Sequence, residues 1–396
     1  MRETNGKGNG SDPDHPVAHS HQDVFAAEHS PFVPGHREDP WPTAGWLAVE
    51  PEAQGMDSGV LAGTIEAFRG RGVHSLAVIR GGRLVAEAYD RGTEAEVPQD
   101  VRSVTKSIVS ALTGAALADG KLKSVEQRAA EFFPVLEGDP VKSQIRIKHL
   151  LSMTSGLQWD NAEDRSSVAM MHSDNWIDYI LARPAASSPG KVSTYSNGDA
   201  HLLSAVLQEA VGAPLSEYAR TRLFGPLGIG NFRWNADPQG RSIGAWAMAL
   251  TARDMAKLGW LFLKEGEWEG KALLPKGWVR ESLSKRVVHH YKDGRQGGYG
   301  YFWWLKPLAS GLLGADKRSY ETFYAAGSGG QRIFVVPGLE LVVTLTASSA
   351  DGEMPEELLN GVVRSIRPKS QLPAAPDSAC RLTQAIRSFK TEPYKV

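Results

Sequence analysis

Residues 101–108 read V-R-S-V-T-K-S-I and place a serine, Ser103, three positions before a lysine, Lys106. Apolar residues at helical spacing follow, and Gly120 ends them, so the pattern predicts a helix over residues 103–119. Positions i and i+3 lie on one face of a helix, which brings the two side chains together. The stretch therefore predicts a long helix whose amino end carries a hydroxyl beside an amine.

This pairing of side chains has a chemical use. A serine hydroxyl is a poor nucleophile until a neighbouring base accepts its proton, and a lysine becomes such a base when burial lowers its pKa. The free N–H groups and the dipole at a helix amino end also favour a developing negative charge. Ser103 is thus a candidate nucleophile, with Lys106 as its candidate base.

The Ser-x-x-Lys spacing alone is a weak signal, because it occurs three times in the chain. Ser188 and Lys191 flank a Pro-Gly turn, which gives their side chains no fixed relationship. Ser282 and Lys285 end a short polar helix, and no other candidate catalytic residue lies near them in the sequence. Only the pair at residues 103–106 begins a long helix, so only this pair is a catalytic candidate.

Two hairpins bracket a largely helical middle. Residues 76–89 read as two strands joined by Gly-Gly, and residues 333–346 as two strands that turn at Pro-Gly. Isolated hairpins are only marginally stable, so we expect both in one antiparallel sheet. Helices are also predicted over residues 201–211, 251–265 and 353–366. This order indicates an α+β fold, with the middle helices covering the sheet and forming a second lobe beside a cleft.

The composition limits the class of protein. The 396 residues carry a net charge of −1 with mixed signs, which argues against nucleic acid or a membrane surface as a partner. Cys380 is the one cysteine, which excludes an internal disulfide and a cysteine-rich metal site. No apolar run reaches 18 residues and the amino end lacks the apolar part of a secretory signal. We therefore expect a cytoplasmic protein.

Histidine is concentrated near the amino end. Five of the eleven histidines fall in residues 1–45, at His15, His19, His21, His29 and His36. The segment is rich in Gly, Asp and Pro, so we expect a flexible arm rather than a metal site, and no cofactor. A histidine-based triad stays open as an alternative to the lysine, with His149 and His201 as candidates, although both lie in apolar contexts typical of core histidines.

Two further stretches of sequence support a catalytic role for residues 101–108. Residues 189–197, P-G-K-V-S-T-Y-S-N, hold the chain's single Tyr-x-Asn, at Tyr195 and Asn197. Residues 324–332, Y-A-A-G-S-G-G-Q-R, read as a strand of small residues that leads into the second hairpin. With Ser103 and Lys106, and in this order, they resemble the motifs of the serine β-lactamase and penicillin-binding-protein superfamily.

Three more stretches resemble segments of the class C-like branch of that superfamily. They are H-L-L-S-M-T-S-G-L at 149–157, L-F-G-P-L-G-I at 223–229 and G-Y-G-Y-F-W-W at 298–304. The branch includes class C β-lactamases, family VIII carboxylesterases and 6-aminohexanoate-dimer hydrolases. The likeness covers roughly residues 50 to 366.

The resemblance implies a β-lactamase/transpeptidase-like fold. Its parts are a five-stranded antiparallel sheet flanked by helices, an all-helical lobe and a site in the cleft between them. The hydrolase domain would span residues 46–368, with a sheet lobe at about 46–120 and 290–368 and a helical lobe at about 121–289. An arm at 1–45 and a tail at 369–396 would lie outside it.

The resemblance also implies roles for single residues. Ser103 matches the nucleophile that is acylated, and Lys106 matches the base that shuttles its proton. Tyr195 matches the tyrosine that exchanges protons with the serine and the leaving group. Asn197 matches a residue that orients the substrate, with a loop-stabilising amide as the alternative. The backbone N–H groups of Ser103 and Ser328 would form the oxyanion hole.

The third motif departs from the superfamily pattern. Many members carry Lys-Thr-Gly or Lys-Ser-Gly on the strand that lines the site, where this chain has Ala-Ala-Gly at 325–327 or, in another register, Gly-Ser-Gly at 327–329. The lysine, which in the family holds a substrate carboxylate, is absent in both registers. The small residues, Gly327 and Gly329 among them, indicate room for an uncharged acyl group.

Aromatic residues supply further candidates for substrate contacts. Trp159 and Asp160 follow the Thr-Ser-Gly-Leu stretch and are candidate rim residues. Trp303 and Trp304 are candidates for an apolar wall, although most of the eleven tryptophans are expected to pack between lobes.

These observations favour a metal-independent serine hydrolase that acts on a small-molecule ester or amide, as a monomer or homodimer. The absence of the third-motif lysine and of the apolar part of a secretory signal fits a carboxylesterase or an amide-oligomer hydrolase best. A β-lactamase or D,D-peptidase is the second hypothesis. A catalytically silent lactamase-like binding module is the third, against which the intact Ser103, Lys106 and Tyr195 argue.

Overall fold

The computed structural model describes residues 41–390, apart from 315, 317 and 369. Nearly all of the arm predicted over residues 1–45 lies outside this part of the chain, as do its five histidines and the question of a metal site there.

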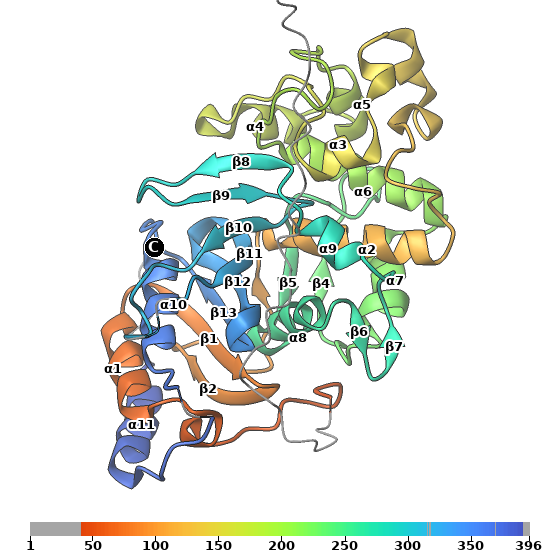
Figure 1. The fold of residues 1–396 in the computed structure, drawn as a ribbon. Coiled ribbons are helices and arrows are strands. Elements are labelled where there is room, and N and C mark those ends of the chain that lie inside the picture. Colours follow the sequence, from red (N-terminus) through yellow and green to blue (C-terminus); the bar gives the residue numbers. More distant parts are fainter. Residues whose placement is uncertain (1–40, 315, 317, 369, 391–396) are drawn as a thin grey trace, which may run out of the picture. The chain divides into compact units, whose positions relative to one another are not determined.

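The two predicted hairpins form and share one sheet. Strand β1 pairs with β2 in the first hairpin, β12 with β13 in the second, and β1 with β13 between them, all antiparallel. The full strand order is β2-β1-β13-β12-β11-β10-β9-β8 (Figure 1). The strands are β1 (Val73–Arg80), β2 (Arg83–Tyr89), β8 (Val287–His290), β9 (Gln296–Tyr299), β10 (Trp304–Pro307), β11 (Glu321–Gly327), β12 (Gln331–Val336) and β13 (Leu341–Ala347).

The sheet therefore has eight strands, where the resemblance implied five. Strands β8, β9 and β10 account for the difference, because residues 287–307 fold back twice beside β11. This extension was not predicted, because β9 holds two glycines, a residue that is depleted in strands.

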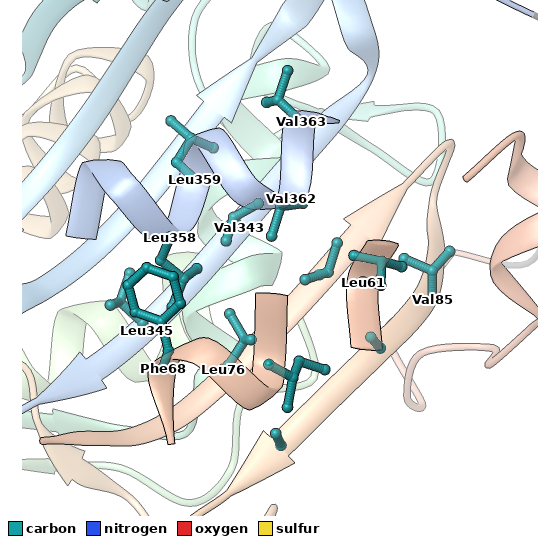
Figure 2. Packing of buried hydrophobic residues seen from close by; sticks show 14 of the residues in the cluster. Leu61, Phe68, Leu76, Val85, Val343, Leu345, Leu358, Leu359, Val362 and Val363 are labelled. Atoms are coloured by element: carbon teal, nitrogen blue, oxygen red, sulfur yellow. The ribbon is translucent and has the colours of Figure 1, made fainter. Parts of the chain in front are cut away.

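Helices cover both faces of the sheet. On one face, α1 (Ser58–Phe68) and α10 (Met354–Arg364) bury apolar side chains against alternate residues of β1 and β13. Figure 2 shows this cluster, with labelled residues Leu61, Phe68, Leu76, Val85, Val343, Leu345, Leu358, Leu359, Val362 and Val363. The intervening residues of the same strands face α8 (Ala252–Leu263), so the central strands are buried on both sides.

Helix α8 lies close to the sheet because of a glycine and a cap. A Cβ on Gly259 would come within 2.7 Å of a Val342 methyl, so only a glycine permits this approach. Thr251 caps the helix, its hydroxyl accepting from the Asp254 N–H at 3.0 Å, which agrees with the predicted start.

Helix α2 (Val104–Ala118) confirms the helix predicted over residues 103–119. It packs beneath β11 and against α6 (Asn197–Val211), the helix predicted over residues 201–211, which begins four residues earlier than expected. Ser196 caps α6 by accepting from the Asp199 N–H at 3.0 Å. This earlier start includes Asn197 in the first turn of the helix.

Short elements fill the rest of residues 99–289. The helices are α3 (Ile147–Leu151), α4 (Arg165–Met171), α5 (Trp176–Leu181), α7 (Leu215–Ala219) and α9 (Trp278–Ser282). A small sheet joins β3 (Gln99–Asp100), β5 (Met248–Leu250) and β4 (Arg233–Trp234), and β6 (Glu267–Trp268) pairs with β7 (Lys271–Ala272). The region expected to be an all-helical lobe thus also carries short strands.

The segment treated as a tail after residue 368 holds an amphipathic helix. Helix α11 (Pro376–Ser388) packs on α1, and it buries Leu382 and Ala385, with Phe389 just beyond its end, in the same apolar cluster as α1 and α10. Arg381 forms an ion pair with Glu66 on the exposed side.

We expect Phe389→Ala to destabilise the protein by roughly 3–5 kcal/mol, because the ring is 1% exposed and its removal leaves a cavity. Urea unfolding followed by far-UV circular dichroism measures the loss. Arg387→Ala, an exposed position of the same helix, is the matched control and should change stability by no more than about 0.5 kcal/mol. Equal effects of the two changes would contradict the packing of α11.

Candidate active site

The turn that carries Ser103 is held from both sides. Arg102 has a positive φ of 52°, an unfavourable conformation for a residue with a side chain. Its N–H donates to Asp100 Oδ1 at 2.8 Å and its Nε lies 3.1 Å from Asp100 Oδ2. The Val101 N–H donates to the Met248 carbonyl at 2.9 Å. These bonds fix Ser103 at the position directly before the first residue of α2, where its side chain makes no capping hydrogen bond.

Lys106 lies beside Ser103, as the spacing predicts. Its Nζ is 2.8 Å from Ser103 Oγ, 2.9 Å from Asn197 Oδ1 and 2.7 Å from the Ala245 carbonyl oxygen. The side chain is 1% exposed. Burial lowers the pKa of Lys106, against the opposing effect of Tyr195 and Asp164. A buried lysine with a depressed pKa in contact with a hydroxyl has the properties of a general base.

Tyr195 reaches the same place from the loop before α6. The Lys106 Nζ lies 4.9 Å from the centroid of the Tyr195 ring. Asn161 Nδ2 donates to the Tyr195 carbonyl at 2.6 Å and fixes the backbone of this loop. The structure thus brings together Ser103, Lys106 and Tyr195, three residues that the sequence singled out.

Asn197 connects three helices. Its Oδ1 accepts from Lys106 on α2, and its Nδ2 donates to Ser167 Oγ on α4 at 2.9 Å. Both ends of the amide are therefore engaged by the protein. Its predicted contact with substrate stays a prediction, and the structure adds a second task, the orientation of Lys106.

The Ala245 carbonyl is a partner of Lys106 that the sequence analysis missed. It belongs to a loop pinned to α6: Ser204 Oγ donates to the Ser242 carbonyl at 2.7 Å, and a Cβ on Gly244 would come within 2.3 Å of the Ala200 carbonyl oxygen. Residues 240–244 also spell G-x-S-x-G, the nucleophile pattern of α/β-hydrolases. Ser242 is buried, however, and its Oγ accepts from the Ser216 N–H, so it holds the loop.

The end of β11 approaches the nucleophile turn closely. A Cβ on Gly327 would come within 2.5 Å of the Val101 carbonyl oxygen and 2.9 Å of the Arg102 Cβ. Ser328 follows in a short 3₁₀ turn over Ser328–Gly330. Within the described part of the chain, the N–H groups of Ser103 and Ser328 donate no hydrogen bond, which leaves both free for a ligand.

The cavity in front of these groups has a volume of about 670 Å³. Ser103, Tyr195, Asn197, Gly327 and Ser328 all line it. This size falls in the range of sites for small molecules.

One wall of the cavity is aromatic. Trp304 on β10 stacks between Tyr195 and Tyr324, with ring centroids 6.3 Å apart on each side. Trp304 therefore lines the cavity, as proposed from the sequence. Its neighbour Trp303 faces the opposite way and packs against Phe262 and Phe323 in the core.

Three predicted contacts do not line this cavity. Gly329 has a positive φ of 80° and turns the chain between β11 and β12. Trp159 is buried against Gly198, where a Cβ would approach the Trp159 ring to 2.4 Å. Asp160 accepts from the Ala162 N–H at 2.9 Å and pairs with Arg165. All three therefore shape the surrounding backbone in this structure.

Arg332 lines the cavity and was not singled out from the sequence. It lies on β12 directly opposite Ala326 on β11. Its signal in the sequence is a single charge directly before the apolar run at 333–336. A solvent-facing position at the start of a strand has the same pattern, so one sequence does not distinguish the two.

The histidines considered for a triad do not line the cavity. His201 is fully buried and its Nε2 lies 3.1 Å from Asp237 Oδ2. His149 Nδ1 accepts from the Arg146 N–H at 3.1 Å, and burial lowers the pKa of His149 to about 4. The Lys106 scheme is the one that the geometry favours. No cluster of three or more metal-ligating side chains occurs among residues 41–390 as described.

Asp199 supports the loops around the site. It is 1% exposed on α6, and it accepts from the Ser155 hydroxyl at 2.7 Å and the Ser155 N–H at 3.4 Å. Burial raises the pKa of Asp199 to about 7, although these hydrogen bonds act in the other direction.

The sequence model of the family described as Beta-lactamase matches residues 61–367. The 6-aminohexanoate-dimer hydrolase of Paenarthrobacter ureafaciens is 21% identical over 295 residues, which cover 69% of this chain and 72% of that protein.

Two solved structures resemble this one in fold. EstCE1, a hydrolase with promiscuous acyltransferase activity, has a TM-score of 0.64 at 20% identity, with 77% of this chain and 99% of that chain covered. The octameric penicillin-binding protein homologue from Pyrococcus abyssi has a TM-score of 0.61 at 18% identity, with 80% of each chain covered. The predicted β-lactamase/transpeptidase-like fold is confirmed. Among the described helices, none is long and apolar enough to cross a membrane.

The raised pKa of Asp199 predicts a pH dependence of stability. The native state keeps the proton up to about pH 7, whereas the unfolded chain releases it near 3.8, so between these values stability falls as pH rises, by at most about 1.4 kcal/mol per pH unit. We expect Asp199→Asn to remove this component. Urea unfolding of both proteins at pH 5, 6, 7 and 8 measures it: the variant should gain relative to wild type up to pH 7 and then stay level. A constant difference across this range would contradict the shift.

Proposed function

Because the chain belongs to the β-lactamase family, we propose that it is a serine hydrolase that cleaves an ester or amide through an acyl-enzyme on Ser103. The observation that carries the proposal is the 2.8 Å contact between Lys106 Nζ and Ser103 Oγ, in a place where burial lowers the pKa of the lysine. Neither a metal nor a cofactor is needed for this chemistry.

Acylation begins when Ser103 loses its proton. With Lys106 neutral, Ser103 Oγ donates across the same 2.8 Å contact and attacks the substrate carbonyl carbon as the proton moves to the lysine. Tyr195 lies close to Lys106 and lines the cavity, so it is placed to pass the proton to the leaving group. The carbon–leaving-group bond then breaks and the Ser103 ester remains.

The developing oxyanion requires donors that are already in place. The free N–H groups of Ser103 and Ser328 belong to segments in contact at Gly327, and each donor is typically worth about 10²–10³ in rate. Deacylation reverses the roles: water loses a proton to the Tyr195–Lys106 pair, attacks the acyl carbon and returns Ser103 to its hydroxyl form.

The substrate class that we propose is a small carboxylic ester or a linear amide oligomer. The cavity of about 670 Å³ admits a molecule of that size, and its wall of Trp304 and Tyr324 suits an apolar chain. A 6-aminohexanoate-dimer hydrolase and an esterase are among the proteins that the chain resembles. A β-lactam or D-alanyl peptide is the alternative, since proteins named for those activities are also similar.

We expect Ser103→Ala to abolish covalent labelling. Intact-mass spectrometry after brief incubation with p-nitrophenyl butyrate, a fluorophosphonate or benzylpenicillin should give a wild-type adduct that the variant lacks. Fast ester turnover with slow penicillin turnover supports the esterase or amidase, and rapid penicillin turnover supports the lactamase instead. If no probe labels the wild type, the protein is a catalytically silent module.

The oxyanion hole has a separate test in Gly327→Ala. The added Cβ meets backbone at 2.5 Å, so β11 must move away from the nucleophile turn, and we expect about a 100-fold loss of kcat for p-nitrophenyl butyrate with an unfolding cost of about 1–3 kcal/mol. Gly230→Ala is the matched control, since a Cβ there meets nothing within 4 Å. Unchanged turnover in Gly327→Ala would refute the assigned position of the oxyanion hole.

A further inference from the structure

A second cavity lies on the same face of the sheet as the cavity that holds Ser103. Every second side chain along a strand points to the same face, so Thr322, Tyr324 and Ala326 of β11 share this face. Ala326 lines the candidate active-site cavity, and Thr322 lines the second cavity, which has a volume of about 150 Å³. The two cavities thus follow each other along β11.

A single layer of side chains separates the two cavities. Tyr291, Tyr324 and Arg332 each line both of them. The hydroxyl oxygens of Tyr291 and Tyr324 are 3.2 Å apart, which joins the two rings across this wall. Tyr291 directly follows β8, an edge strand that pairs with β9 alone. Tyr291 is therefore the part of the wall that a movement of the β8–β9 hairpin would displace.

The second cavity combines apolar side chains with one buried hydroxyl. The apolar side chains are Pro307, Leu308, Phe334, Pro355 and Leu359. Thr322 is 4% exposed, and among the described residues its Oγ1 has no hydrogen-bond partner. A buried hydroxyl without a partner is unfavourable, and a ligand that donates or accepts one hydrogen bond relieves it. The lining therefore suits an apolar group that carries one neutral polar atom.

The partly buried charged groups around this cavity already have partners in the protein. Lys306 pairs with both Asp293 and Glu356. Arg295 pairs with the same two acids, so two cations balance two anions. Arg332 donates through Nη1 to two backbone carbonyls. A neutral ligand group leaves these contacts intact, whereas a charged one would compete with them.

The size of the second cavity and its place on β11 define the ligand further. An apolar cavity of about 150 Å³ holds a molecule of the size of benzene. Tyr324 and Thr322 stand three and five residues before Gly327, where β11 meets the nucleophile turn. A strand rises about 3.4 Å per residue, so the two residues lie roughly 10 and 17 Å from Gly327. An extended chain covers about 3.4 Å with every three bonds, so roughly nine to fifteen bonds span this distance.

We propose that the second cavity is a distal subsite, which holds the neutral far end of a linear substrate while its ester or amide bond lies at Ser103. Tyr291 moves out of the wall to let the chain pass, and Thr322 binds a hydroxyl or amide near the chain end. The inference rests on the proposed function for the position of the reacting bond, and on the second cavity for the far end. A linear amide oligomer or a long hydroxyacyl ester has the required chemistry. A neutral chain also agrees with the uncharged acyl group that the absent lysine indicated.

The first test compares long and short chains on either side of the reacting bond. p-Nitrophenyl dodecanoate and p-nitrophenyl butyrate vary the acyl side, and dodecyl butyrate and ethyl butyrate vary the leaving-group side, all below their micelle-forming concentrations. Leu308→Trp fills the second cavity from a half-buried position. In one of these pairs it should lower kcat/KM for the long member at least about 10-fold more than for the short one. Val135→Trp, at an exposed position outside both cavities, is the matched control and should leave the ratio unchanged.

The second test concerns the hydroxyl of Thr322. In the pair that responds to Leu308→Trp, a terminal hydroxyl on the long chain should raise kcat/KM about 3- to 10-fold, because it gives Thr322 a partner. Thr322→Val keeps the shape of the side chain without its hydroxyl and should abolish this preference, whereas Thr322→Ser should retain it. A preference that survives Thr322→Val would place the chain end elsewhere and overturn the proposal.

Equal effects of Leu308→Trp on the long and short members of both pairs would likewise overturn the proposal. A binding measurement separates this outcome from a failure of the proposed function. Benzyl alcohol, a neutral aromatic alcohol, is titrated against Ser103→Ala and Ser103→Ala/Leu308→Trp by ligand-observed NMR, and it should bind the first protein more tightly. If wild type hydrolyses no ester but this difference holds, the proposed function fails and the second cavity stands as a site for neutral groups. Without the difference, the distal subsite fails whatever the enzyme hydrolyses.

Discussion

The site depends on the burial of one ammonium group. An isolated charge is costly to remove from water unless every donor is satisfied. Lys106 has three donors, and it has three acceptors: Ser103 on its own helix, Asn197 at the start of α6 and the Ala245 carbonyl in a loop. These groups come from distant parts of the chain. The lysine is thus held, with its pKa lowered, only when α2, α6 and the loop are all in place.

Close contacts between backbone segments hold α2, α6 and the loop in these positions. Gly244 lets the loop with Ala245 lie against α6, and Gly327 lets the end of β11 lie against the turn before Ser103. Neither position has space for a Cβ, so the two glycines set distances that side chains would have widened. The sheet fixes β11 between β10 and β12, and α2 packs beneath it. The core therefore sets the distance between nucleophile and the predicted oxyanion donors.

The features that the sequence predicted correctly are those that depend on residues close together in the chain. The Ser103–Lys106 contact follows from helix geometry, and the two hairpins follow from turn residues and alternating strands. The Ala245 carbonyl could not be predicted, because any residue offers a carbonyl and only the folded loop selects this one. Trp159 was expected at the rim on account of its place in the chain, yet the ring packs on Gly198, a contact between elements nearly forty residues apart. Strands β8 to β10 were not predicted, because their pairing depends on the neighbouring strands rather than on their own composition.

Two cations near the cleft show how similar groups acquire different tasks. Lys106 has protein acceptors for all its donors, so it needs nothing from a ligand and is free to exchange a proton with Ser103. Arg332 has acceptors for one nitrogen only, and its acidic neighbour Glu356 already pairs with Lys306 and Arg295. A guanidinium does not give up its proton at ordinary pH, so it cannot replace the lysine as a base. Lys106, whose pKa burial lowers, is therefore the cation suited to proton transfer, and Arg332 is not.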